Sequence, residues 1–207
     1  MIRVISAAAL VSLAAHALAA PPPPPHGPLP DWPCNTETRE TLTVAGVLSR
    51  SVATPSPSEG AWRTDPVVKA AADFAAAPEN APQFGAERLA ALAAAAGPHK
   101  DRMLLEALDG IVTQTNTLRG IIIDGIGDKV VKSRLLAERL ASVEHDLAAL
   151  PADATPQQRG ALTQARESML RALGDNADDA ELLCHRLGYT RHKAERLAAA
   201  IAEQLGH

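Results

Sequence analysis

The sequence contains very few aromatic residues, since Phe, Trp and Tyr together make up 2% of its 207 residues. It also lacks segments in which β-branched and polar residues alternate, which is the pattern of half-buried β-strands. Alanine and leucine are abundant instead, together with Arg, Glu and Lys, and these residues favour helices. The composition therefore predicts an all-α protein.

A surplus of positive charge is missing as well. The chain has 20 Lys and Arg residues against 24 Asp and Glu residues, and its formal net charge is −4. Domains that bind nucleic acids usually present a basic surface, so we expect no nucleic-acid partner. The sequence also contains no G-x-S-x-G, P-loop or dinucleotide-binding motif, and no C-x-x-C-H motif for covalent haem. We therefore expect a protein that is not an enzyme and binds no cofactor.

Long apolar runs are absent after the N-terminus. The first run, MIRVISAAALVSLAAHALAA, has an early Arg3, an apolar middle and a small-residue end, which is the layout of a secretory signal peptide. Its small residues predict cleavage after Ala19, and an uncleaved anchor is the alternative. No later run reaches the roughly 20 apolar residues that a membrane span needs. We expect a periplasmic protein without an integral membrane span after signal cleavage.

The chain has only two cysteines, Cys34 and Cys184. In an oxidising compartment an even number of cysteines indicates disulfide bonding, so we expect one bond that closes a long loop. A redox-active pair is the alternative, although such pairs usually have C-x-x-C spacing. Cys34 follows PPPPPHGPLP, a stiff polyproline stretch that cannot join a helix. The disulfide would tether this stretch to the body, with Trp32 as an apolar anchor beside it.

Helix-boundary signals divide the rest of the chain. Thr64 or Asp65 can cap a first helix, Gly97 followed by proline ends a second, and Thr155 can cap a later one. The predicted organisation is a signal peptide over residues 1–19, a proline-rich extended arm over 20–60 and a helical bundle domain over 61–207.

The middle of the chain has two apolar seams with the alternating spacing of four and three residues that is typical of coiled coils. They comprise Leu104, Leu108, Ile111, Thr115, Leu118 and Ile122, and then Leu136, Leu140, Val143, Leu147 and Leu150. Three glycines lie between them, at Gly120, Gly125 and Gly127. The flanking pattern favours one long, bent helix over a turn between two helices, and a hinge remains an alternative.

We expect a further helix over residues 156–173, a turn at GDNADD whose acidic residues begin the next helix, and a final helix over 178–205. The predicted fold is an antiparallel helical bundle around a long central helix hairpin. Its N-terminal proline-rich arm would be joined to the last helix through the disulfide.

Three groups of polar residues are candidates for a functional site. Glu181, His185 and His192 lie roughly on one face of the last helix and are weak candidates for metal binding, so no metal site is favoured. The basic residues within 186–196 indicate a solvated face, with an anion-binding or membrane-surface patch as the alternative. The third group can form a buried polar network or a partner-facing notch, and it comprises Asn116, Arg119, Asp124 and Asp128.

Several stretches together resemble a family of exported bacterial all-helical proteins that is described only as uncharacterised. They are DWPC after the export signal, WRTDP, LLEALDGIVTQTNTLRGIIIDGIGD running into SRLLAERL, and a single late cysteine. NTETRE after DWPC differs from the basic and hydrophobic residues of that family. The resemblance implies a periplasmic helical protein and supplies no catalytic residue.

Two hypotheses about function follow. The first is a periplasmic helical accessory or interaction protein, whose partner is another periplasmic protein or a second copy of itself. The second is a carrier for a metal ion or small apolar ligand, which would use the last helix or the isoleucines at 121–123.

Overall fold

The computed structural model describes residues 29–48 and 59–205, and all regular secondary structure in these ranges is helical. The prediction of an all-α fold is therefore confirmed. The predicted signal peptide, its cleavage site and all but the last two residues of the polyproline stretch lie outside the described residues. Among the helices described, none is long and apolar enough to cross a membrane.

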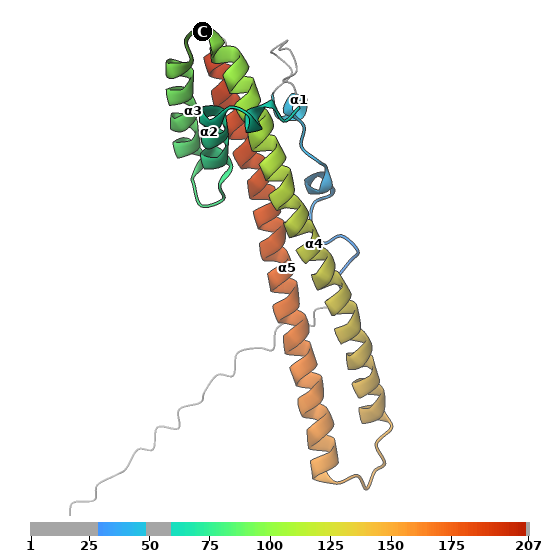
Figure 1. The fold of residues 1–207 in the computed structure, drawn as a ribbon. Helices are drawn as coiled ribbons and strands as arrows, with labels where there is room; N and C mark the ends of the chain where they lie inside the picture. The colour runs from blue at the N-terminus through green and yellow to red at the C-terminus, as the bar shows by residue number, and fades with distance from the viewer. Residues whose placement is uncertain (1–28, 49–58, 206–207) are drawn as a thin grey trace, which may run out of the picture.

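Two long helices form an antiparallel hairpin that runs the length of the molecule (Figure 1). α4 comprises Lys100–Ala148 and α5 comprises Pro156–Leu205, so at 1.5 Å per residue each is about 74 Å long. An ion pair between Arg166 Nε and Glu144 Oε1, 3.0 Å apart, joins the two helices near their connection. Thr155 caps α5, because its Oγ1 accepts a hydrogen bond from the backbone of Gln158.

Two shorter helices, α2 (Pro66–Ala76) and α3 (Pro82–Ala96), pack against one end of the hairpin (Figure 1). We call α2, α3 and the parts of α4 and α5 that they contact the head. Of the two predicted candidates, Thr64 and Asp65, it is Asp65 that caps α2, because its Oδ1 accepts hydrogen bonds from two backbone N–H groups of the first turn. Gly97 ends α3 with a positive φ of 54°, a conformation that glycine adopts easily. The 3-10 turns η2 (Ala61–Arg63) and η3 (Gly97–His99) flank these helices.

The main hydrophobic core lies in the head and contains residues of every helix there. Most of the first predicted seam is buried, including Leu104, Leu108 and Ile111. Small side chains on α2 allow close packing, and Gly110 of α4 is in contact range of Ala72 and Trp62. The arm contributes to the same core through Leu42, Val47 and Leu48.

The described part of the arm, residues 29–48, follows the hairpin from its middle toward the head (Figure 1). It contains the 3-10 helix η1 (Thr36–Arg39) and one short turn of helix, α1 (Val44–Val47). Leu29 N donates a hydrogen bond of 2.9 Å to Ser133 Oγ, in the C-terminal half of α4. The arm is therefore a strap packed on the helices, as the disulfide hypothesis required.

The prediction of a turn at GDNADD is wrong, because α5 continues through these residues without a break. Leu173, Asn176 and Ala180 are buried against α4, whereas Asp175, Asp178 and Asp179 are exposed. The local sequence favours a turn, but burial of every third or fourth residue along one face favours a helix. The packing against α4 outweighs the local preference, so the helix continues. The acidic residues therefore cap no helix.

The glycines at 120, 125 and 127 lie inside one continuous helix, as the favoured prediction stated. Only Gly125 lies near another side chain, since a Cβ atom there would be 3.5 Å from Leu183. The positions at Gly120 and Gly127 face open space. These two glycines are therefore not required by close packing within the described chain.

Candidate functional site

The arm is attached to α5 by the predicted disulfide between Cys34 and Cys184, whose Cα atoms are 5.3 Å apart. The bond lies beside a small second hydrophobic cluster, separate from the main core, whose buried members are Ile122, Ile126 and Leu187. Trp32 packs against this cluster and donates a hydrogen bond of 3.1 Å from Nε1 to Asn35 O. Trp32 therefore lies where an anchor beside the disulfide was expected.

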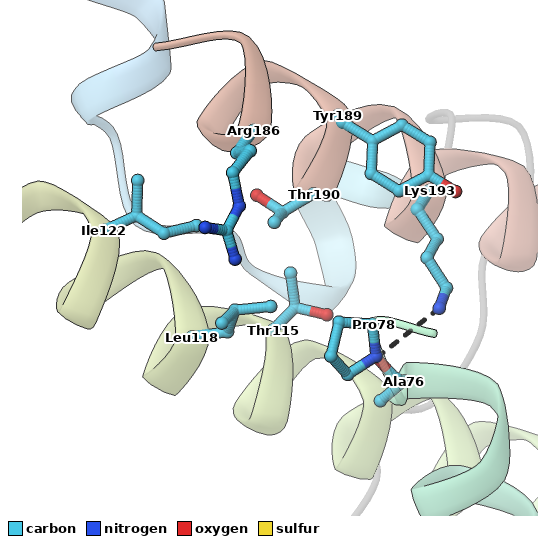
Figure 2. Close-up of a pocket in the computed structure, with 9 residues that line it drawn as sticks. All are labelled: Ala76, Pro78, Thr115, Leu118, Ile122, Arg186, Tyr189, Thr190 and Lys193. Carbon is cyan, nitrogen blue, oxygen red and sulfur yellow. Dashed lines mark hydrogen bonds between the residues drawn. The ribbon is translucent and has the colours of Figure 1, made fainter. Parts of the chain in front are cut away.

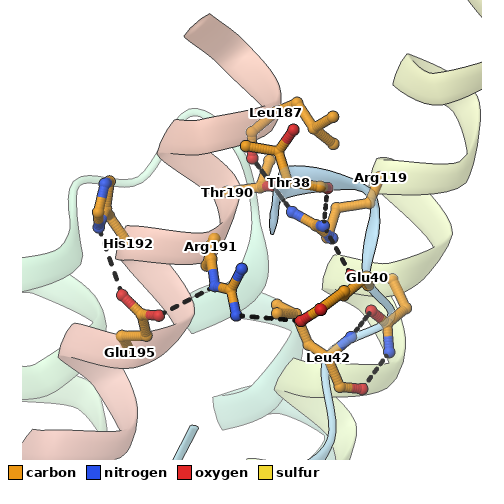
Figure 3. A network of polar contacts seen from close by, with 10 residues as sticks. Thr38, Glu40, Leu42, Arg119, Leu187, Thr190, Arg191, His192 and Glu195 are labelled. Carbon is orange, nitrogen blue, oxygen red and sulfur yellow. Dashed lines mark hydrogen bonds and ion pairs between the residues drawn. The ribbon is translucent and has the colours of Figure 1, made fainter. Parts of the chain in front are cut away.

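Arg119 of α4 binds the arm and α5 at the same time (Figure 3). Its side chain is only 2% exposed. Nη2 donates to the carbonyl oxygens of Thr38 and Glu40, and Nη1 donates to the Leu187 carbonyl and to Thr190 Oγ1, at 3.2 and 3.3 Å. All four acceptors are neutral. Burial, and then the charge of Arg191, lower the pKa of this guanidinium, which nevertheless stays protonated.

Asn116 holds the next part of the arm. Its Oδ1 accepts a hydrogen bond of 3.0 Å from Leu42 N, and its Nδ2 donates one of 2.8 Å to Leu42 O. The side chain thus satisfies both the backbone N–H and the backbone carbonyl of one residue of the arm. Of the four polar residues in the predicted network, the buried Arg119 and the half-buried Asn116 bind the arm, whereas Asp124 and Asp128 are exposed.

A pocket of about 150 Å³ opens between α4, α5 and the connection from α2 to α3 (Figure 2). Its apolar floor consists of side chains from α4 and the α2 end, among them Leu118, Ile122 and Pro78. Arg186, Tyr189 and Lys193 line it from α5. Figure 2 shows the Arg186 side chain extended toward Ile122 and Leu118.

Lys193 lies beside this pocket and is 5% exposed. Its Nζ donates hydrogen bonds to the carbonyl oxygens of Ala76, Ala77 and Asn80, and so closes the C-terminal end of α2. Burial lowers the pKa of the Lys193 ammonium, and the nearby Glu79 carboxylate partly offsets this effect. The interpretation of 186–196 as a solvated face is therefore wrong for Lys193, while Arg186 and Arg196 are exposed.

The two histidines proposed as metal ligands do not come together. His185 Nε2 lies 3.5 Å from Glu181 Oε1, and His192 Nδ1 lies 3.3 Å from Glu195 Oε2. Seven helical residues separate the histidines by about 10 Å along the axis, too far for one ion. Within residues 29–48 and 59–205, no three His, Cys, Asp or Glu side chains are grouped as a metal site would require.

Beyond the head and the described part of the arm, α4 and α5 are the only described elements of the hairpin (Figure 1). We call residues 134–172 the distal hairpin, and none of them is buried. The second predicted seam, which begins at Leu136, is only half-buried here. Leu135 is 50% exposed and Val131, one turn earlier, is also exposed. The arm's polar contacts with α4 reach as far as this boundary, at Ser133 and at Arg134, which pairs with Asp31.

Sequence reasoning did not identify the roles of Lys193 and Asn176. Asn176 is buried between the long helices and donates a hydrogen bond of 2.8 Å from Nδ2 to Lys129 O. Asn176 fits the spacing that starts at Leu173 and continues through Ala180, Leu187 and Ala194, whereas Lys193 lies one residue before the last of these positions. Extending that spacing through GDNADD would have indicated the burial of Asn176, but it gives no signal for Lys193.

The fold and these contacts define an all-helical protein with a long two-helix hairpin and a disulfide-linked strap. Comparison with models of protein families, with curated proteins and with solved structures gave no match.

Proposed function

We propose that this protein is an exported, periplasmic interaction module that binds a helix of another protein along its distal hairpin. The observation that carries the proposal is the change in burial along the hairpin. In the head, α2 and α3 complete the packing of α4 and α5, and seam residues such as Leu104 and Leu108 are fully buried. In the distal hairpin no residue is buried, and the seam is open to a further helix.

Helical hairpins bury their seams best when three or four helices share them. An amphipathic helix from a partner would pack on the half-buried leucines of the distal hairpin, as α2 and α3 pack on the hairpin at the head. We expect apolar residues at every third or fourth position of that partner helix. Leu135 lies at the end of this surface that is nearer the head, and the exposed Val131 lies one turn before it, where the partner helix would extend past the distal hairpin. The disulfide supports export, because such bonds persist in oxidising compartments.

Site-specific photo-cross-linking in living cells tests the proposal. A cross-linking amino acid placed at Leu135 should yield one discrete adduct that is heavier than the chain. The same amino acid at Phe84, which has nearly the same exposure, 52% against 50%, but lies in the head, should yield none. Adding Val131→Glu to the position-135 chain should abolish the adduct, whereas Phe84→Glu should leave it intact. Because both residues are exposed, neither change should alter the melting temperature much.

Three outcomes would contradict the proposal. They are no adduct at position 135, equal adducts at positions 135 and 84, or an adduct of twice the mass of the chain, which indicates self-association. The export part is tested separately by mass spectrometry of the purified protein. We expect a chain that begins at Ala20 and gains two hydrogens on reduction.

A further inference from the structure

We propose that the pocket between α4, α5 and the α2–α3 connection binds a small carboxylic acid with a compact apolar body, of about the size of benzoate. This pocket lies beside the head, away from the distal hairpin, so the proposal is independent of the partner-binding function.

The dimensions of the pocket set the size of the ligand. Its volume is about 150 Å³, and an engineered protein cavity of that volume accepts benzene. Pockets for larger ligands usually measure about 300 Å³ or more, so a nucleotide or a lipid would not fit. The floor is apolar, with Leu118 and Ile122 from α4 and Pro78 from the α2–α3 connection. An apolar ring or branched chain is therefore the part that would enter.

The surrounding charges set the sign of the ligand. Arg119 and Lys193 are buried near the pocket, and all hydrogen bonds recorded for either cation end on neutral oxygens. Lys193 lines the pocket itself, and Thr190 connects Arg119 to it, because Thr190 lines the pocket and accepts a hydrogen bond from Arg119. Glu79 is the carboxylate that acts on Lys193, and it is exposed. Buried cations without directly bonded carboxylates favour an anion nearby.

Arg186 can supply the direct contact. Its guanidinium extends over the floor of the pocket (Figure 2), and within the described chain no hydrogen bond or ion pair engages it. A guanidinium matches a carboxylate with two parallel N–H donors. Lys193 cannot play this part, because the three carbonyl oxygens at the end of α2 already accept its protons. Tyr189 also lines the pocket from α5.

These features distinguish a carboxylic acid from inorganic anions. Phosphate and sulfate would meet Arg186 but would leave the apolar floor in contact with water. A neutral aromatic compound would cover the floor but would leave the guanidinium unpaired. A compact carboxylate satisfies both parts of the pocket at once.

Benzoate and its neutral counterpart benzamide are suitable probes, followed by calorimetry and by NMR shifts of the Leu118 and Ile122 methyl groups in the intact protein. We expect benzoate to bind with a Kd on the order of 1 mM or below, given its few atoms. Benzamide should bind at least about tenfold more weakly, since it lacks the charge-assisted contact.

Arg186→Met is the test variant and Arg196→Met is its matched control. Both arginines are exposed on α5, but Arg196 does not line the pocket. Arg186→Met should weaken benzoate binding about tenfold or more, and Arg196→Met should leave it unchanged. Circular dichroism verifies that both variants remain helical. The proposal is refuted if benzoate does not shift the floor methyl groups, if benzamide binds equally well, or if the two variants weaken binding equally.

Discussion

Removing the disulfide should lower the stability of the whole protein, not only that of the arm. Cys34 and Cys184 are 150 residues apart, so the bond restricts nearly the entire unfolded chain. The chain-entropy model assigns a loop of this length a stabilisation of about 5 kcal/mol. For a protein of this size 1 kcal/mol corresponds to about 2–4 °C, so the melting temperature should fall by about 10–20 °C.

The arm cannot simply detach while the helices stay folded. Leu42, Val47 and Leu48 belong to the main core, and the Arg119 guanidinium would lose two acceptors and remain buried without them. Loss of the arm would thus expose apolar surface and leave a charge unsatisfied. Unfolding of the arm and of the head should therefore be one transition.

The assay is thermal unfolding followed by circular dichroism in the Cys34→Ser/Cys184→Ser double variant, which avoids a free thiol. The wild-type protein should melt at the lower temperature only after reduction, whereas the double variant should not respond to reductant. An unchanged melting curve of the double variant in oxidising buffer would refute this reasoning. A separate early transition of the arm would refute the coupling between arm and head.

Two further predictions concern α4 and α5. Gly110→Ala should destabilise the protein by about 1–3 kcal/mol, because the new Cβ would lie 2.8 Å from Ala72 Cβ and 2.9 Å from the Trp62 ring. Gly127 faces open space, so Gly127→Ala should stabilise the protein by up to about 1 kcal/mol. Urea unfolding measures both, and equal effects would contradict the packing. Lys193 has a lowered pKa when folded, so the unfolded chain binds more protons between that value and the ordinary 10.5, and stability rises with pH across this window. The stability of wild type relative to Lys193→Met should therefore increase as the pH is raised toward 10.5, and a flat or falling difference would contradict the burial of the charged group.

The sequence predicted those features of the fold that depend on short stretches of chain. Asp65 before a proline, Thr155 before α5 and Gly97 after α3 each act on their own helix end, so their effects can be inferred locally. The seam from Leu104 to Ile122 repeats regularly enough to indicate one buried face. The pairing of Cys34 with Cys184 followed because no other cysteine exists.

The features that the sequence did not predict depend on contacts between distant segments. Lys193 is an ordinary surface residue by composition, and its burial depends on carbonyl oxygens at the end of α2. For Arg119 the sequence left a buried network and a partner-facing notch open, and it did not indicate that the arm supplies its acceptors. Asn176 lies in a stretch whose local preference is a turn, and α4 overrides that preference. The pocket likewise forms only when α4, α5 and the α2–α3 connection meet.

The distal hairpin is the part of the described chain that its own packing supports least. Ordering its backbone costs about 1–2 kcal/mol per residue, as it does elsewhere, but none of its residues is buried to offset that cost as Leu104 or Leu108 does in the head. Burial on α4 ends at Ser133, and Ser133 also accepts the hydrogen bond from Leu29 at the start of the described arm. The head and the disulfide therefore stabilise a hairpin that is longer than its own packing supports. A long hairpin with a half-exposed seam is understandable if a second molecule completes its packing, and for this reason we place partner binding on the distal hairpin and not on the head.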